Sequence, residues 1–274
     1  MALLNLPNEI LLIIGRYIDS QNALYALVRT CRRLHTLFIH TLYRFNITRH
    51  NFSALPYLSE HGQEDIIRRF LAEDAHVPPQ TQHQWRVVLA CVNFDYHPYI
   101  GQIATKSNPL SGAAKNGHEG IIRLLLFELG VSPNVRDTQL SFPLHWAAEN
   151  GHVGVAKLLV EYGGADIYAL GRFSLTPLAA AGVNGHTTML QYLYSTIIAQ
   201  GQKNPVLEAR NTLHRVIHSG QIETFLLLLD AVQDVNIYMP VHTPLTLAAQ
   251  KGQVNIVEAL LTRGADLEKR TREF

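Results

Sequence analysis

Histidine is the residue type in this sequence that could most directly carry chemistry, since 14 of the 274 residues are histidines. An imidazole can ligate a metal ion or transfer a proton near neutral pH. Three histidines recur at a constant interval along the chain (His118, His152 and His186), and two more, His145 and His214, share a second position. Recurrence at a fixed period favours a structural role, in which each ring hydrogen-bonds the backbone of a neighbouring unit.

The short motifs of enzymes and metal sites do not accompany these histidines. Neither His-Glu-x-x-His nor a paired Cys-x-x-Cys occurs, and Gly-x-Ser-x-Gly and glycine-rich phosphate-binding loops are also missing. Cys31 follows Arg29 and precedes Arg32 and Arg33. A lowered thiol pKa is one interpretation of that setting, and a packed helical cysteine is the preferred one. We therefore expect a non-enzyme with no catalytic residue, no metal and no cofactor.

Bulk composition narrows the class of protein further. A hydrophobic content of 47% with 16% charged residues is ordinary globular composition, and the formal net charge of +1 gives no global field for nucleic acid. Two cysteines, Cys31 and Cys91, suit a reducing compartment. The early apolar run, residues 10–15, is too short to span a membrane and lacks the layout of a signal peptide. We expect a soluble protein of the cytoplasm, the nucleus or both, with neither nucleic acid nor membrane as a partner.

A unit of two short helices positions the histidines. In residues 142–166, Pro143 suits the first turn of a helix, Gly151 ends that helix, and Val155 begins the apolar stripe of a second helix. After one longer first step, the glycine recurs at nearly even spacing, as Gly62, Gly117, Gly151, Gly185, Gly220 and Gly252. Six copies of a unit too small to fold alone predict a solenoid.

The unit resembles the ankyrin repeat. The matching residues include Pro143-Leu144-His145, Ala147-Ala148, Gly151-His152, Thr176-Pro177-Leu178, Thr243-Pro244-Leu245 and Gly264-Ala265-Asp266. The resemblance implies an all-α fold, an ankyrin-repeat α-solenoid with hairpin fingers, over residues 49–274. We expect repeats near residues 53–75, 108–137, 142–168, 174–200, 210–236 and 242–268. Repeat five departs from the pattern, with Val216 and Ile217 at the alanine positions.

The N-terminal segment, residues 1–48, does not follow the repeat. Apolar spacing predicts three short helices there, too few to hold a core alone, so this module needs a partner or a surface on which to dock. Leu6-Pro7, Glu9-Ile10, Ile18-Asp19, Leu24, Leu27-Val28, Cys31-Arg32 and Leu34 lie on the commonest positions of the F-box, which the module resembles. The alternative is a helical cap on the solenoid.

An F-box implies docking on a Skp-type adaptor and, through it, on a cullin-based ubiquitin ligase. We expect Leu6, Pro7, Ile10 and Leu24 to form that contact. Residues 76–107 interrupt the array, and we expect one extra helix there that packs on the side of the array, with substrate binding as the alternative. We also expect a looser excursion over residues 196–210.

Recognition is then the task left to the array. First-helix residues and finger tips of a curved stack form a concave face, which by position includes Trp146, Glu149, Asn150, Gln250 and Lys251, with Tyr168 and Tyr238 in the fingers. Trp146 is the leading candidate for a binding anchor, with packing against the neighbouring first helix as its alternative. The predicted function is a substrate-recruiting subunit of a cullin-type ligase, whose protein target is unknown; the alternative is an ankyrin scaffold without a ligase role.

Overall fold

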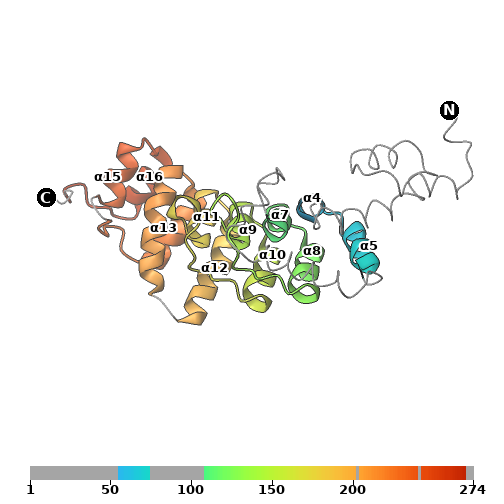
Figure 1. Ribbon diagram of the computed structural model, residues 1–274. Helices are drawn as coiled ribbons and strands as arrows, with labels where there is room; N and C mark the ends of the chain where they lie inside the picture. The colour runs from blue at the N-terminus through green and yellow to red at the C-terminus, as the bar shows by residue number, and fades with distance from the viewer. Residues whose placement is uncertain (1–54, 75–107, 202–203, 240–241, 270–274) are drawn as a thin grey trace, which may run out of the picture.

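The computed structural model describes residues 55–74, 108–201, 204–239 and 242–269. These residues form an elongated array of antiparallel helix pairs, arranged in chain order from α4 and α5 at one end to α15 and α16 at the other (Figure 1). Helices are the only regular elements in the described ranges, which confirms the predicted all-α class and the solenoid.

Each unit pairs an inner helix with an outer helix. The inner helices are α4 (Leu55–Glu60), α7 (Pro109–Lys115), α9 (Pro143–Glu149), α11 (Pro177–Val183), α13 (Pro205–Ser219) and α15 (Pro244–Gln250). The outer helices are α5 (Glu64–Asp74), α8 (Glu119–Arg123) with its π-helical continuation η2 (Leu124–Glu128), α10 (Val153–Lys157) with η3 (Leu158–Tyr162), α12 (Thr187–Gln200), α14 (Ile222–Val232) and α16 (Val254–Thr262). Inner helices pack on inner helices from α4 to α15, and outer helices pack on outer helices from α8 to α16.

Local sequence explains where the inner helices begin and end. All but α4 start with a proline, which needs no backbone donor in the first turn. The side chains of Asn108, Thr176, Asn204 and Thr243 accept backbone N–H groups of that turn. A glycine with positive φ, such as Gly151 at 74°, follows the helix and turns the chain into the outer helix.

The predicted apolar positions form one continuous core. Leu144, Ala147, Val155 and Leu159 of the cleanest repeat are at most 1% exposed, and they join the same cluster as their counterparts in the other repeats. Leu261 is an exception, because it is 42% exposed on the last outer helix of the described residues.

Repeats four and five are matched in volume. Val216 is fully buried in the alanine position of repeat five, and the facing helix α11 carries Gly182. A Cβ atom on Gly182 would lie 2.8 Å from Cγ2 of Val216. The smallest side chain in one repeat thus makes room for a larger one in the next, and interior packing density is kept.

The region between repeats four and five differs from the prediction. Helix α12 runs to Gln200 and α13 begins at Pro205, so the excursion expected over residues 196–210 is mostly helical. Asn204 and Pro205 form the same cap-and-proline start as Asn108 and Pro109. The predicted helices of residues 1–48 and the predicted insertion of residues 76–107 lie outside the described residues.

Candidate protein-binding surface

The recurring histidines join consecutive repeats. Nε2 of His118, His152 and His186 lies 3.1, 3.0 and 2.9 Å from the backbone carbonyl oxygens of Glu60, Lys115 and Glu149, respectively. A carbonyl only accepts, so each Nε2 carries a proton and donates it to the last turn of the preceding inner helix. The predicted structural role of these three histidines is confirmed.

Glycine makes this junction geometrically feasible. A Cβ atom on Gly117 or Gly151 would lie 2.8 Å from Nδ1 of the histidine in the following repeat. Gln221 and Gln253 occupy the same place against Gly185 and Gly220 in the last two repeats. Both glutamines directly follow a repeat glycine, so the periodicity could have identified them together with the histidines.

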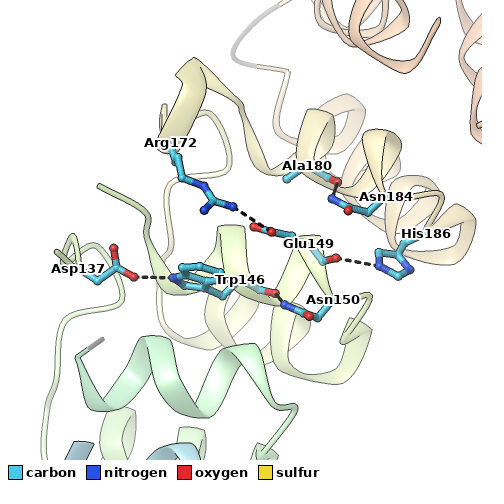
Figure 2. Close-up of polar contacts among 8 residues, drawn as sticks. All are labelled: Asp137, Trp146, Glu149, Asn150, Arg172, Ala180, Asn184 and His186. Carbon is cyan, nitrogen blue, oxygen red and sulfur yellow. Dashed lines mark hydrogen bonds and ion pairs between the residues drawn. The ribbon is translucent and has the colours of Figure 1, made fainter. Parts of the chain in front are cut away.

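Trp146 is a structural anchor of a finger (Figure 2). Its indole Nε1 donates to Oδ2 of Asp137 at 2.5 Å, and Oδ1 of the same carboxylate accepts the backbone N–H groups of Gln139 and Ser141. Lys115 lies over the indole ring at 5.2 Å. Only 5% of Trp146 is exposed, so most of the indole packs inside the array.

Burial follows from the position of Trp146 between two helices and a finger. The indole offers little area to a partner, and its direct contact with a target stays a prediction. The alternative of packing against the neighbouring repeat agrees with this geometry, since one of the two cations over the ring, Lys115, comes from the preceding inner helix α7, and the other, Arg172, lies over it at 5.6 Å from the following finger. No spacing rule would have linked Trp146 to Asp137, because the turn between them brings the two side chains together.

Glu149 and Asn150 are held by neighbours. Arg172 donates to Oε1 of Glu149 at 3.1 Å, and the Nδ2 group of Asn150 donates to the carbonyl of Trp146 at 2.9 Å (Figure 2). Asn116 and Asn184 make the same bond within their own helices. The recurrence of this asparagine indicates helix capping, a role that the predicted target contact of Asn150 leaves out.

The predicted tyrosines differ in exposure. Tyr168 is 8% exposed and belongs to the core cluster, so it offers little surface at its finger. Tyr238 is half-buried and has Lys269 over its ring at 4.7 Å. Gln250 and Lys251, at the end of α15, are exposed as expected. Contact of these residues with a target stays a prediction.

The exposed aromatic side chain of this face was missed. The finger between repeats three and four contains the short 3-10 helix η4 (Arg172–Ser174), whose Phe173 is 72% exposed. Phe173 and Ser174 have positive φ values of 58° and 53°, a left-handed conformation that is costly for residues other than glycine. No glycine signal marks these two positions, so the sequence could not predict this exposure.

Cavities lie on both sides of Phe173. A cavity of about 190 Å³ separates the finger from α9 and α11 and includes His145 in its lining. Another of about 440 Å³ separates the finger from α13 and is lined by His214, Arg215 and His218. A third, of about 410 Å³, shares His214 and Arg215 with the second. The inner face is thus hollowed beside α13.

The two histidines at the second shared position have different environments. His145 is 3% exposed, and its Nε2 lies 2.9 Å from the carbonyl of Leu175. Burial lowers the pKa of His145, against the opposing effect of that carbonyl. Burial and then the neighbouring charges of His218 and Arg215 lower the pKa of the half-buried His214. One imidazole is a core group, and the other faces a basic surface.

Other kinds of site have no counterpart in the part of the chain that the structure describes. There, histidine, cysteine and acidic side chains form no group of three placed to hold a metal ion. The helices of those same residues include none with the length and apolar character needed to cross a bilayer.

Stacked helix pairs with intervening fingers define a class of repeat protein, and comparison with known families identifies it. The family model described as ankyrin repeats matches at residues 91–171, 110–204 and 178–271. The chain belongs to the ankyrin-repeat family. A second family model, described as F-box-like, matches residues 3–47, so an F-box-like domain precedes the array.

A solved structure supports the fold independently. The crystal structure of the human ASB11 ankyrin repeat domain aligns with a TM-score of 0.56 at 20% sequence identity, covering 79% of this chain and 86% of that chain. At this identity the likeness shows the fold alone. Ankyrin repeats and F-box-like domains are typically non-catalytic, and together they support a role in protein interaction or as a substrate adaptor.

Proposed function

We propose that this protein is a substrate-recruiting subunit of a cullin-type ubiquitin ligase. The F-box-like domain would dock on a Skp-type adaptor, and the ankyrin array would hold a protein target. The observation that carries the proposal is the order of the two parts, an F-box-like match at residues 3–47 followed by a repeat array with a hollowed inner face. Neither part performs bond chemistry in this scheme; the ligase gains rate because the target is held close to the transferring partner.

Composition supports the proposed setting. Two cysteines among 274 residues suit a reducing compartment, which agrees with a place in the cytoplasm, the nucleus or both. The formal net charge of +1 gives no reason to expect nucleic acid as the recruited partner.

Binding of the full-length chain to a purified Skp-type adaptor tests the proposal. A double change, Leu6→Asp with Pro7→Ala, removes two of the residues expected at the contact and should abolish capture of the adaptor. Asn8→Asp is the matched control, because it adds the same negative charge at a variable position of the Leu-Pro-x-Glu-Ile pattern. This control should bind as the parent chain does.

Two outcomes would refute the ligase role. One is the absence of adaptor binding by the parent chain, and the other is equal binding by the parent and the double variant. Either would favour the scaffold alternative, in which the N-terminal helices only cap the array. Circular dichroism of all three proteins checks that lost binding is not lost folding.

A further inference from the structure

Basic side chains gather on the inner face beside α13, where the chain departs most from the repeat pattern. Asn211 lies three residues before His214 and four before Arg215, and His218 lies four and three residues after them, so the four share one face of the helix. His214 and Arg215 line both the cavity of about 410 Å³ and that of about 440 Å³, Asn211 lines the first, and His218 lines the second. Burial is the main cause of the lowered pKa of His214 and His218, and Lys251, at the end of α15, lies near enough to lower both further.

Negative charge is scarce around these cavities. Glu208 is the one carboxylate among the residues that line them, and its Oε1 accepts a hydrogen bond from Oγ1 of Thr176 at 2.8 Å. Arg210 and Arg215 line the same space, and His242 adds to the positive potential at His214. The cavities are therefore complementary to an anionic group.

Unpartnered polar atoms point to the same kind of ligand. Nε of Arg210 and Oγ1 of Thr212 are buried, and neither has a hydrogen-bond partner among the described residues. Thr212 is 1% exposed, and both residues line the cavity of about 410 Å³. A buried donor without a partner is costly, and both atoms are closed to solvent, so an incoming carboxylate would remove that cost only where the cavity wall shifts to admit it.

The shape of the site indicates an extended occupant. His214 and Arg215 line both cavities, so a ligand that fills the two must pass across them. Phe173 lines the second cavity with a ring that is 72% exposed and held at its place by a left-handed backbone. Exposed aromatic residues are favoured binding anchors, so an apolar side chain of the ligand would pack here.

We propose that the surface formed by Phe173, Arg210, His214, Arg215, His218 and Lys251 binds an acidic segment of the target protein. The segment carries Asp or Glu beside an apolar residue; its carboxylates lie against α13 and its apolar side chain against Phe173. The inference rests on the proposed role of the array as the target-binding half of the protein, and it adds the chemistry of the target.

Selection of displayed random peptides on the full-length chain tests this inference. We expect the recovered peptides to be enriched in Asp and Glu next to Leu, Ile or Phe, relative to the starting library. Arg215→Glu reverses a charge in the surface and should abolish that enrichment. Arg123→Glu makes the same reversal on the exposed side of α8, away from the cavities, and should leave the selection unchanged.

A recovered peptide then serves as the probe in a fluorescence-anisotropy titration. Binding should weaken on the order of tenfold in Arg215→Glu and in His218→Glu. His218 is exposed, so its variant tests the charge even if Arg215→Glu disturbs folding. Affinity should also fall as the salt concentration rises, because partly exposed charges are screened.

Lowering the pH should strengthen peptide binding. His214 and His218 gain protons as the pH falls below about 6.5, because burial and neighbouring positive charges lower the pKa of each from that ordinary value, whereas Glu carboxylates, with an ordinary pKa of about 4.3, stay largely ionised down to about pH 5.5. Arg210, Arg215 and Lys251 keep their charge over this range, so the histidines of this surface and the neighbouring His242 account for the change.

Selected peptides without an excess of Asp and Glu, or equal binding of a selected acidic peptide to the parent and His218→Glu, would overturn the inference. Adaptor binding, measured on the same variants, should not change. If the chain binds the acidic peptide but not the adaptor, the ligase role is refuted and the proposed peptide-binding surface is retained. If it binds the adaptor but not the peptide, only the peptide-binding surface is refuted.

Discussion

Repeats three and five place different residues at equivalent positions. Trp146 in α9 and Arg215 in α13 both lie five residues before the glycine of their repeat. Trp146 is buried and fastens a finger, whereas Arg215 is half-buried and lines two cavities. Repeat three keeps the pattern best and uses the unusual Trp146 for stability. Repeat five buries Val216 and Ile217 at the alanine positions and places Arg215 on the wall of two cavities. The same position of the repeat therefore serves architecture in one unit and lines a candidate binding surface in the other.

The largest expected effect is on the stability of repeat three. Trp146→Ala should lower the free energy of unfolding by about 3–5 kcal/mol, because a large buried side chain is lost and the carboxylate of Asp137 loses its indole partner. Arg215→Ala should cost less than about 1 kcal/mol, since it removes a half-buried group outside the core. Urea unfolding followed by far-UV circular dichroism measures both. Equal losses of unfolding free energy in the two variants would contradict the proposed difference between a structural Trp146 and a surface Arg215.

A smaller effect tests the volume match between repeats four and five. Gly182→Ala should destabilise the protein by about 1–3 kcal/mol, because the new Cβ would lie 2.8 Å from Cγ2 of Val216. Val216→Ala alone should also destabilise it, by creating a cavity. The double variant should recover much of the loss, since the small pair approaches the alanine pattern of the other repeats. If the loss of unfolding free energy in the double variant equals the sum of the two single losses, the proposed volume match between Gly182 and Val216 is contradicted.

The smallest effect concerns the pH dependence of the two histidines at the shared position. Burial lowers the pKa of His145 below the ordinary value of 6.5. Below pH 6.5 the unfolded chain thus binds a proton that the folded chain does not, so the contribution of His145 to stability is full above that pH and declines as the pH falls.

Glutamine variants isolate the contribution of each histidine to the pH dependence of stability. Replacing His145 with Gln should reduce the loss of stability between about pH 7.5 and 5.5, and His214→Gln should reduce it less, because His214 is only half-buried. Unfolding of the parent and both variants at the two pH values provides the measurement. A larger effect of His214→Gln than of His145→Gln would contradict the prediction that the more deeply buried histidine contributes more to the pH dependence of stability.

Periodicity predicted the parts of this molecule that repeat. The fold, the core stripes and the roles of His118, His152 and His186 all follow from spacing, because a solenoid makes the same contact at each junction. The exposure of Phe173 depends on a left-handed backbone at a residue that normally avoids it, and no motif announces that conformation. The cavities beside α13 depend on how a finger folds against a helix of a later repeat, as between Phe173 and His214. Local sequence patterns do not predict such contacts.

Some missed features did have a signal. Asn204 before Pro205 is a helix start of the same kind as Asn108 before Pro109, and it would have predicted the long α13 in place of a loose excursion. The recurrence of Asn116, Asn150 and Asn184 would have marked Asn150 as a cap.

The junctions between repeats also bear on how such an array can be rearranged in evolution. At the junctions where a histidine packs on a glycine, as between His152 and Gly117, each repeat contributes one residue of the contact. Duplication or deletion of a whole repeat therefore recreates the same contact between its new neighbours. Gly182 and Val216 instead fit each other closely, because a Cβ on Gly182 would lie 2.8 Å from Cγ2 of Val216, with Leu190 of its own repeat next at 3.1 Å. A unit inserted between repeats four and five would leave a clash on one side or a void on the other. The fit between Gly182 and Val216 thus ties repeat four to repeat five.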